Sequence, residues 1–404
     1  MKGAMMMLRK TFTLLVITVF ALTGCQSSGT ASGTVNASNS PTPSATITPQ
    51  PTTAAETPTP GSTAVPNKGN ETPSKVSMNG VTAVRLADAK SGWIGGKGWI
   101  ARTDDGGVKW KVQYEGTGDI KQLFALNSQD AWAVASDEGK LLSTKDGGQH
   151  WTSIGKVPNQ AFLHFVSKTE AFSGNAHTVD GGVKWTSLSV PEGTKGDAYF
   201  HDKNNGWAVR QVKDVIEVQR TQDGGKTWNK VMSRKTAASL TGVVIRSAGI
   251  NDAWVELIGE SGMTQTSYSL FHTKDGGKNW LTVLANSTAG GGPAPGFPAG
   301  ENTGPKNTGS KPGPLYVVSP DVAYMGGQCP SCDKPNSVGW TKDGGKTWVN
   351  GKESFTGYGE LLLAMADITQ GWLITNDNEQ PSVMYTTASG GVSWNKVHTF
   401  NALK

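Results

Sequence analysis

The sequence predicts an all-β protein: a single seven-bladed β-propeller of four-stranded antiparallel blades, preceded by a disordered tether. One observation behind this prediction is a motif, Thr-x-Asp-Gly-Gly-x-x-Trp, that recurs seven times with its Trp residues 41, 34, 43, 52, 68 and 46 residues apart. Such spacings are typical of propeller blades. The other is composition, since 14 Trp and 52 Gly stand among 404 residues of which only 17% are charged. This low charge argues against coiled coils and long exposed helices.

Residues 1–24 have the pattern of a secretory signal peptide. Basic residues precede an apolar run over residues 11–22, which is shorter than the ~20 residues that a membrane-spanning helix needs. The run ends in Leu-Thr-Gly-Cys, which resembles the bacterial lipobox. This resemblance implies that Cys25 carries a diacylglycerol and becomes the N-terminus. We therefore expect a lipoprotein that Cys25 holds on the outer face of a bacterial membrane; the alternative is an ordinary signal peptide with a chance Cys.

Cleavage before Cys25 also changes the charge. The full chain has a formal net charge of +5, but the part after the signal peptide holds 34 Lys and Arg against 32 Asp and Glu, a net charge of +2. Nucleic-acid-binding domains usually carry a strong, clustered positive charge. We therefore expect no nucleic-acid partner.

Residues 25–75 are predicted to form the disordered tether. After Cys25 this segment contains 11 Thr, 8 Ser and 8 Pro, four charges and no aromatic residue. Such a composition cannot bury enough apolar surface to offset the entropy of the chain. The segment would hold the domain at a distance from the membrane.

Residues 76–404 are predicted to form the propeller, because each of the seven units reads as four strands in a fixed order. An aliphatic strand comes first and a strand opening with a small residue and an aromatic residue comes second. A strand that enters the motif comes third, and a strand that carries the motif Trp comes fourth. In the motif, Gly-Gly allows a positive φ and the acidic side chain can accept turn hydrogen bonds, so we assign it a structural role. The residues at the acidic position are Asp105, Asp146, Asp180, Asp223, Asp275, Asp343 and, in the last copy, Ser389.

These motifs resemble Asp-box (BNR) repeats, and the seven-unit layout resembles the photosystem II assembly and stability factor family of β-propellers. The resemblance covers residues 76–404. It implies that each box lies on the outer hairpin between the third and fourth strands. It is specific for the fold and not for the function, and the arginine patch of that family cannot be placed on this sequence residue by residue, so the partner role of the family stays open here.

An enzyme is the alternative to a binding protein. Sialidases and xyloglucan-active hydrolases share the Asp-box, so a glycan-cleaving activity is one option, and a receptor-like peptide or ligand binder is another. A glycosidase needs two carboxylates facing one substrate, and no such pair is marked in this sequence. The six His residues show no metal-ligand spacing. We therefore predict no catalytic residues, no metal and no cofactor.

A ligand site is expected where the innermost strands meet. Nine residues before each aromatic marker the sequence is always apolar, which is typical of a core. Eight residues before the marker, polar and aromatic side chains appear instead, and we predict that these form a binding ring: Arg85, His164, Tyr199, Arg246 and Tyr316.

Two further segments lie outside the repeat pattern. Cys329 and Cys332 form a Cys-x-x-Cys motif in a predicted loop, where a structural disulfide is the default outside the cytoplasm and thiol chemistry is the alternative. Residues 287–314 are rich in Gly and Pro, with Phe297 as the only aromatic residue, and are predicted to be a flexible insertion.

Taken together, these features predict a lipid-anchored extracytoplasmic propeller that acts as a non-catalytic binding or assembly platform. Its partner would be a protein or a glycan.

Overall fold

The computed structural model describes residues 76–402, and the regular elements in this range are 26 β-strands. The predicted all-β propeller fold is confirmed. Within the described range, no helix has the length and apolar character needed to cross a membrane. The predicted signal peptide (1–24), the lipidated Cys25 and the tether (25–75) lie outside the described residues.

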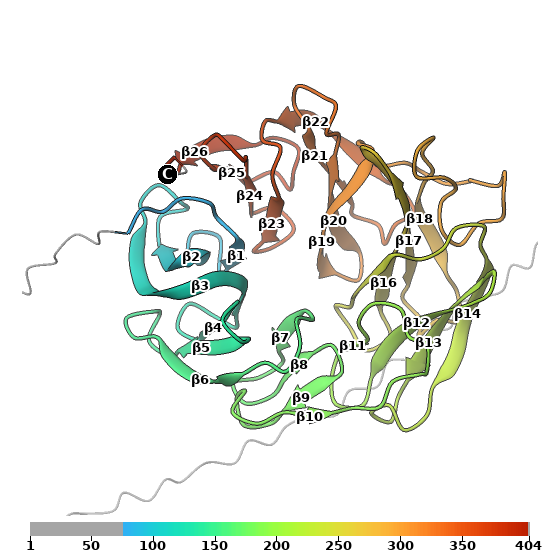
Figure 1. The fold of residues 1–404 in the computed structure, drawn as a ribbon, viewed down its shortest axis with the longest axis horizontal. Helices are drawn as coiled ribbons and strands as arrows, with labels where there is room; N and C mark the ends of the chain where they lie inside the picture. The colour runs from blue at the N-terminus through green and yellow to red at the C-terminus, as the bar shows by residue number, and fades with distance from the viewer. Residues whose placement is uncertain (1–75, 403–404) are drawn as a thin grey trace, which may run out of the picture. The chain divides into compact units, whose positions relative to one another are not determined.

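The strands form six hydrogen-bonded antiparallel sheets that follow one another around a centre (Figure 1). The first sheet has six strands: β1 (Ala83–Leu86), β2 (Gly92–Thr103), β3 (Lys111–Ala125), β4 (Ala131–Ala135), β5 (Lys140–Thr144) and β6 (Thr152–Lys156). The second has four: β7 (Leu163–Phe165), β8 (Ala171–Ser173), β9 (Ala176–Thr178) and β10 (Thr186–Ser187). The third has four: β11 (Tyr199–Phe200), β12 (Gly206–Val212), β13 (Val215–Thr221) and β14 (Asn229–Lys235).

The remaining three sheets also have four strands each. The fourth holds β15 (Gly242–Arg246), β16 (Ala253–Gly262), β17 (Gln265–Thr273) and β18 (Leu281–Asn286). The fifth holds β19 (Lys311–Ser319), β20 (Val322–Gln328), β21 (Asn336–Thr341) and β22 (Val349–Phe355). The sixth holds β23 (Leu361–Met365), β24 (Gly371–Thr375), β25 (Val383–Thr387) and β26 (Asn395–Thr399).

The number of sheets corrects the prediction of seven separate blades. The first two repeats share one sheet because β3 runs from the outer strand of the first repeat into the inner strand of the second. Its first part pairs with β2 as far as Asp119, opposite Lys97, and its second part pairs with β4 from Ile120, opposite Ala135. The strand β2 likewise contains both middle strands of the first repeat. Seven repeats are therefore distributed over six sheets.

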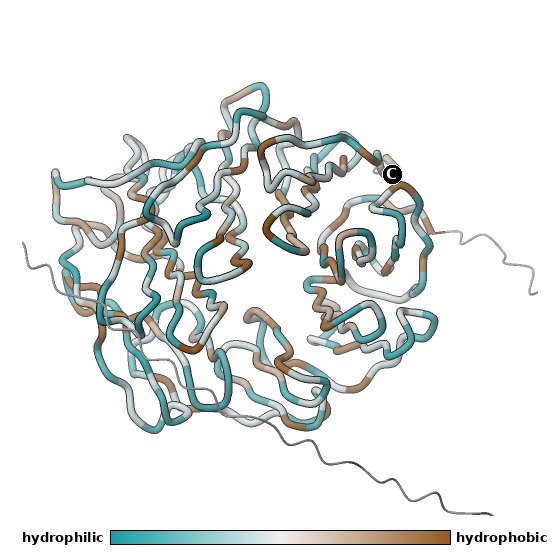
Figure 2. The backbone as a smooth tube through the Cα atoms, turned by 180° about the vertical axis from the view of Figure 1, so that it is seen from behind, coloured by the Kyte–Doolittle hydropathy of each residue, from teal (hydrophilic) through white to brown (hydrophobic). Residues whose placement is uncertain are grey.

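The first strand of each repeat lies nearest the centre, as β1, β7, β11, β19 and β23 show in Figure 1. Hydrophobic stretches follow the strands around this centre, whereas many of the outer loops are hydrophilic (Figure 2). The aromatic markers fill the spaces between strands, and Trp93, Trp207 and Trp254 are fully buried. Burial of such large side chains is a main source of stability in this fold.

The ring closes where the last repeat meets the residues that precede β1. The amide of Asn401 donates to the Met78 carbonyl (3.0 Å), and the Asn376 side chain donates to the Val81 carbonyl (2.8 Å). Val81 also packs in one apolar cluster with Phe400. The closing contacts are therefore loop hydrogen bonds and apolar packing, because the sixth sheet is made of β23 to β26 alone.

Each Asp-box is a hairpin between the third and fourth strands of its repeat. In the second box, the Thr144 hydroxyl donates to Asp146 Oδ1 (2.9 Å) and accepts from the Gly148 amide (2.8 Å). Asp146 Oδ1 also accepts from the His150 amide (3.0 Å), and hydrogen bonds from this amide and from the ring hold the pKa of the Asp146 carboxyl at about 2. The same three backbone and side-chain bonds recur in the other five Asp boxes.

The residue just before the box Thr joins one repeat to the next. In three repeats its side chain donates to the carbonyl of the first Gly in the following box. These bonds run from Arg102 Nη1 to Gly147 O (3.2 Å), from Arg220 Nη1 to Gly276 O (3.2 Å) and from His272 Nδ1 to Gly344 O (2.8 Å). The boxes thus form a chain of contacts between neighbouring repeats.

The segment predicted as a flexible insertion over 287–314 differs from that expectation. Its last residues belong to β19, which starts at Lys311, and Phe297 is only 4% exposed. The guanidinium carbon of Arg234 lies 4.7 Å from the ring centroid of Phe271 and 5.0 Å from that of Phe297. Hydrogen bonds hold the segment as well, because the Ala237 amide donates to the Phe297 carbonyl (2.9 Å) and the Ser269 hydroxyl donates to the Pro295 carbonyl (2.7 Å).

Candidate functional site

The predicted binding-ring residues all lie on innermost strands and occupy the same register position. Each one pairs directly with the aromatic marker of its own repeat. The pairs are Arg85 with Trp93, His164 with Phe172, Tyr199 with Trp207, Arg246 with Trp254 and Tyr316 with Tyr324. Counting eight residues back from a marker therefore reaches the equivalent place in every one of these repeats.

The structure brings all five of these side chains to one central cavity of about 350 Å³. The wall also contains residues from the neighbouring register position, which the sequence assigned to the core alone. These residues are Val84, Leu123, Leu315 and Leu363. The cavity is therefore lined by alternating apolar and polar positions of the inner strands.

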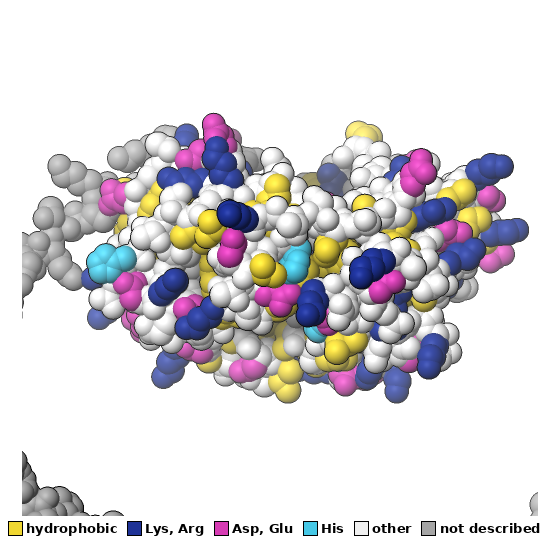
Figure 3. Space-filling view, turned by 90° about the horizontal axis from the view of Figure 1, so that it is seen from below, with side chains coloured by type: hydrophobic (Ala, Val, Ile, Leu, Met, Phe, Trp, Pro, Cys, Tyr) yellow, Lys and Arg dark blue, Asp and Glu magenta, His cyan; other side chains and the backbone are white. Residues whose placement is uncertain are grey.

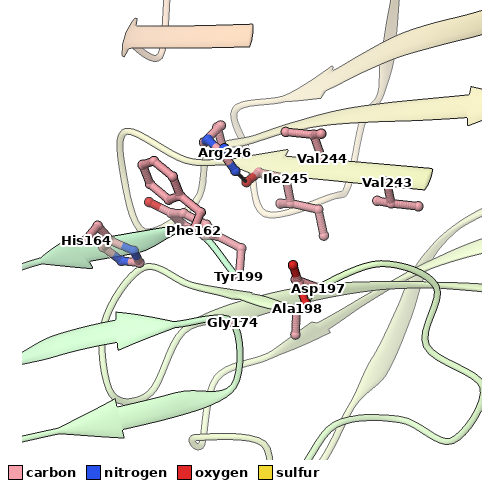
Figure 4. A pocket seen from close by; sticks show the side chains of 10 residues that line it. All are labelled: Phe162, His164, Gly174, Asp197, Ala198, Tyr199, Val243, Val244, Ile245 and Arg246. Atoms are coloured by element: carbon pink, nitrogen blue, oxygen red, sulfur yellow. Dashed lines mark hydrogen bonds between the residues drawn. The ribbon is translucent and has the colours of Figure 1, made fainter. Parts of the chain in front are cut away.

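Arg246 reaches the cavity from the end of β15. Its guanidinium carbon lies 3.8 Å from the ring centroid of Phe162, and its Nη1 donates to the Ile245 carbonyl (2.8 Å) (Figure 4). Burial lowers the pKa of Arg246 from its usual value, but arginine remains charged in proteins. Stacking on an aromatic face fixes the plane of the guanidinium and leaves other N–H groups for a ligand.

Arg85 is arranged in a similar way on the opposite part of the wall. Its guanidinium carbon lies 4.4 Å from the ring centroid of Phe124, and its Nε has no hydrogen-bond partner. Within residues 76–402, neither Arg85 nor Arg246 forms an ion pair with a carboxylate. Two positive charges thus face one cavity without a direct ion pair in the described part of the chain, although Asp197 and Glu256 lie near enough to Arg246 to favour its charged form.

His164 is a buried, neutral part of this wall. Its Nε2 donates to the Phe200 carbonyl (2.9 Å), and its ring stacks on Tyr199 with centroids 4.8 Å apart. Burial, with smaller contributions from nearby positive charges, lowers the pKa of His164 to about 3. The imidazole therefore adds no charge at neutral pH and holds Tyr199 in place.

The two tyrosines of the ring use their hydroxyl protons within the protein. Tyr199 donates to the Ser247 carbonyl (3.2 Å), and Tyr316 donates to the Met365 carbonyl (2.9 Å). Burial raises the pKa of Tyr199 to about 12. The Tyr199 phenol is therefore a neutral wall of the cavity, and the hydroxyl protons of both tyrosines are used in hydrogen bonds within the protein.

A buried acid, Glu256, lies one layer behind Arg246. It is 2% exposed on β16, on the strand that pairs with β15, and its Oε1 has no hydrogen-bond partner. Burial raises the pKa of Glu256 to about 8, although the charge of Arg246 opposes this change. The carboxyl is therefore mostly protonated at neutral pH and does not neutralise Arg246.

A smaller pocket of about 110 Å³ adjoins the central cavity and shares four of its wall residues (Figure 4). It contributes Asp197, an exposed residue and the only carboxylate among the described wall residues of the two spaces. The other side chains there are largely apolar, including Ala198, Val243 and Ile245. The site thus contains two cations, aromatic faces and a small apolar recess.

The other predicted residues lie elsewhere. None of the box residues lines the central cavity, and Cys329 and Cys332 form a disulfide in the loop between β20 and β21. Among the described residues, no group of three or more His, Cys, Asp or Glu side chains could hold a metal ion.

Sequence reasoning missed two important residues of the site. Phe162, which stacks on Arg246, precedes β7 and therefore lies outside the register columns used for the prediction. Glu256 stands within a strand of otherwise apolar residues, Ala-Trp-Val-Glu-Leu-Ile, and that isolated charge was the available signal. Phe124 shares the register column of the predicted ring, because it pairs with Trp132.

The fold and the site together define the class of protein: a β-propeller built from Asp-box repeats, with a central cavity lined by arginines and aromatic side chains. The model of the family described as Photosynthesis system II assembly factor YCF48 matches residues 176–309, about a third of the chain. This family match supports the resemblance predicted from the repeats.

Curated relatives point the same way. The chain is 31% identical over 108 residues to "Photosystem II assembly protein Ycf48" of Synechococcus sp. (strain JA-2-3B'a(2-13)), covering 24% of this chain and 32% of that protein. It is 27% identical over 174 residues to "Photosystem II assembly lipoprotein Ycf48" of Synechococcus sp. (strain CC9902), covering 40% of this chain and 51% of that protein. The matches thus span between about a third and a half of these relatives, and they confirm the resemblance to photosystem II assembly factors.

A solved structure described as YCF48 bound to D1 peptide is also similar. It has a TM-score of 0.48 and 17% sequence identity, and the alignment covers 78% of this chain and 93% of that chain.

Proposed function

We propose that this protein is a non-catalytic platform whose central cavity binds an acidic side chain of a polypeptide partner. The observation that carries the proposal is that Arg85 and Arg246 face one cavity without an ion-pair partner in the described part of the chain. An anionic group between them would supply the missing counter-charge. Arginine suits this task because its planar N–H groups match the geometry of a carboxylate.

The charge of this cavity differs from that of the outer face drawn in Figure 3. On the face drawn in Figure 3, Lys and Arg side chains are interspersed with Asp and Glu side chains. The described wall of the cavity, by contrast, holds Arg85 and Arg246 and no carboxylate, because Asp197 lies in the adjoining pocket and Glu256 is buried behind Arg246. The partly enclosed site also screens charges less than open water does, so each arginine–carboxylate contact counts for more there.

A polypeptide is favoured over a glycan as the ligand. The names of the curated relatives describe assembly proteins, which supports a protein partner, and one of these relatives is named a lipoprotein. The aromatic walls formed by Phe162, Tyr199 and Tyr316 and the small apolar recess suit an extended peptide with mixed side chains. Glycoside hydrolysis would need two facing carboxylates, and the described wall of the cavity does not contain such a pair.

We place the protein on the outer face of a bacterial membrane, held by a lipid on Cys25. The lipobox-like sequence and the lipoprotein name of one relative support this location. Replacing Cys25 by Ala should release the protein from the membrane fraction. If the variant remains in that fraction, the lipid anchor is wrong, whatever the cavity binds.

The binding proposal is tested with a library of short acetylated peptides, each made with one Glu and again with Gln at the same place. Binding is followed through the intrinsic Trp fluorescence, first for the parent protein. We then compare the variants Arg85→Gln and Arg246→Gln, with Arg210→Gln as the matched control, because Arg210 faces Glu217 and lies outside the cavity.

The parent should prefer Glu peptides, and the preference should weaken as salt rises. Each cavity variant should lose about tenfold or more in affinity for the Glu peptide, while the control keeps the parental affinity. Equal binding by the parent and the double cavity variant would show that the arginines do not carry recognition.

A further inference from the structure

The Cys329–Cys332 disulfide lies at an exposed position of the propeller. It is formed in the loop between β20 and β21, and Cys332 is exposed while Cys329 is half-buried. Ser331, Asp333 and Lys334 next to it are also exposed. The disulfide bond is therefore within reach of another protein.

The bond closes a ring too short to act as an important structural staple. The two cysteines are only three positions apart, and a disulfide constrains the unfolded chain less as its loop becomes shorter. The base of the loop is already held without it, because Gln328 pairs with Asn336 in the sheet and the Cys329 amide donates to the Pro335 carbonyl (2.7 Å). The disulfide is therefore not the main support of the base of this loop.

The loop is linked to the segment that leads into β23. The Tyr358 hydroxyl donates to the Cys332 carbonyl (3.1 Å), which directly follows the disulfide ring in the chain. At the base of the same loop, Asn336 donates to the Gly357 carbonyl (2.6 Å) and Gln328 donates to the Gly359 carbonyl (3.2 Å). Residues 357–359 are therefore bonded both to the end of the disulfide ring and to the base of its loop.

That segment leads to the central cavity. It ends at Leu361, where β23 begins, and Leu363 of β23 is part of the cavity wall. Lys334, two positions after Cys332, also lines a groove formed with Lys352, Phe355 and Tyr385, and this groove gives a partner a surface near the loop. The disulfide thus joins an accessible surface to one side of the cavity.

We propose that Cys329 and Cys332 form a reversible thiol–disulfide exchange site that accepts electrons from an extracytoplasmic dithiol protein. A thiolate of that protein attacks the more exposed sulfur of Cys332, the Cys329–Cys332 bond breaks, and Cys329 leaves as a thiolate that takes up a proton. The second thiolate of the partner then attacks its own sulfur in the mixed disulfide. This step releases Cys332 and leaves the partner oxidised, so two electrons have passed to this chain. Exposed disulfides are the ones that commonly undergo such exchange.

Reduction opens the ring and loosens the support that the Cys332 carbonyl gives to the Tyr358 hydroxyl, while the Tyr358 amide still donates to Asp377 Oδ2 (3.0 Å). We therefore expect residues 357–359 to become more mobile in the reduced protein while the propeller stays folded.

The test uses the full chain under native conditions. The protein is treated with about 1 mM dithiothreitol for about one hour, its thiols are alkylated, and the peptide holding Cys329 and Cys332 is measured by mass spectrometry. We expect nearly complete reduction of this disulfide with the thermal unfolding temperature almost unchanged. Reduction that occurs only after unfolding would overturn the proposal.

Hydrogen exchange separates this proposal from a passive surface disulfide. Reduction should speed exchange of the Gly359 amide by about tenfold and leave the amides of β4 unchanged. The variant with both cysteines replaced by Ser should exchange as the reduced protein does, and Tyr358→Phe should give part of the effect in the oxidised protein. Unchanged exchange at Gly359 in the reduced protein and in the double Ser variant would overturn the link to the cavity.

Discussion

Glu256 gives a quantitative test of the structure around the cavity. Its carboxyl is buried between strands, and burial raises its pKa from 4.5 to about 8 in the folded protein. Between these two values the unfolded chain loses its proton while the folded protein keeps it. Stability must therefore fall as pH rises, because the folded state binds more protons than the unfolded state. The full difference between the two pKa values corresponds to about 5 kcal/mol.

The perturbation is Glu256→Gln, which keeps the shape of the side chain and removes the ionisation. Between pH 5 and pH 9 the free energy of unfolding of the parent should fall by about 4 kcal/mol more than that of the variant. A constant offset from the buried amide does not matter, because only the dependence on pH is compared.

The assay is urea unfolding at a series of pH values, followed by Trp fluorescence. Glu379→Gln is the control, because Glu379 is exposed and undergoes the same chemical change. Its pH dependence should equal that of the parent. If the parent and Glu256→Gln also follow parallel curves, Glu256 is ionised in the fold, and the argument that Arg246 lacks a counter-charge fails with it.

Three further changes test other parts of the structure. His164→Gln should reduce the decrease in the free energy of unfolding as pH falls from 7 to 4. Burial lowers the His164 pKa from 6.5 to about 3, so in the parent the unfolded state takes up a proton before the folded state does. Unfolding curves across this pH range measure the change, and a pH dependence equal to that of the parent would contradict it. Arg220→Met should lower the free energy of unfolding by about 2–4 kcal/mol, because the Arg220 guanidinium donates hydrogen bonds to three groups of the next repeat, on Gly276, Ile250 and Asn251. Lys226→Met is the control, because Lys226 is exposed. Equal stability of the two variants would refute the role of this contact. Ser389→Asp should raise the free energy of unfolding by about 0.5–1 kcal/mol at pH 7, because a carboxylate accepts the hydrogen bond from the Ser393 amide more strongly than the present hydroxyl does. A lower urea midpoint for unfolding would show that this box differs from the others.

The sequence predicted the repeating part of the fold, and it also located the shared register position of the ring residues, because both depend on short-range spacing. The turn between an inner strand and its marker has the same length in each repeat, so an offset of eight residues places Arg85 opposite Trp93 and Arg246 opposite Trp254. The Asp-box works in the same local way, since its hydrogen bonds join residues two to four positions apart.

The features that the sequence did not predict depend on contacts between distant residues. In the shared strand β3, Asp119 is the last residue that pairs with β2, opposite Lys97, and no local pattern marks the point where pairing passes from β2 to β4. The order of the Gly-rich segment depends on Phe297 meeting Phe271 and Arg234. The stacking of Phe162 on Arg246 likewise joins residues more than eighty positions apart, so it could be seen only in three dimensions.

The unequal joints of the ring have a mechanical consequence. The first two repeats are joined by a continuous strand, whereas the last repeat meets the first through loop hydrogen bonds and apolar packing near Val81 and Phe400. A force that pulls residues 76 and 402 apart acts first on these loop contacts. The ring should therefore open between the last and the first repeat, while the first two repeats stay joined.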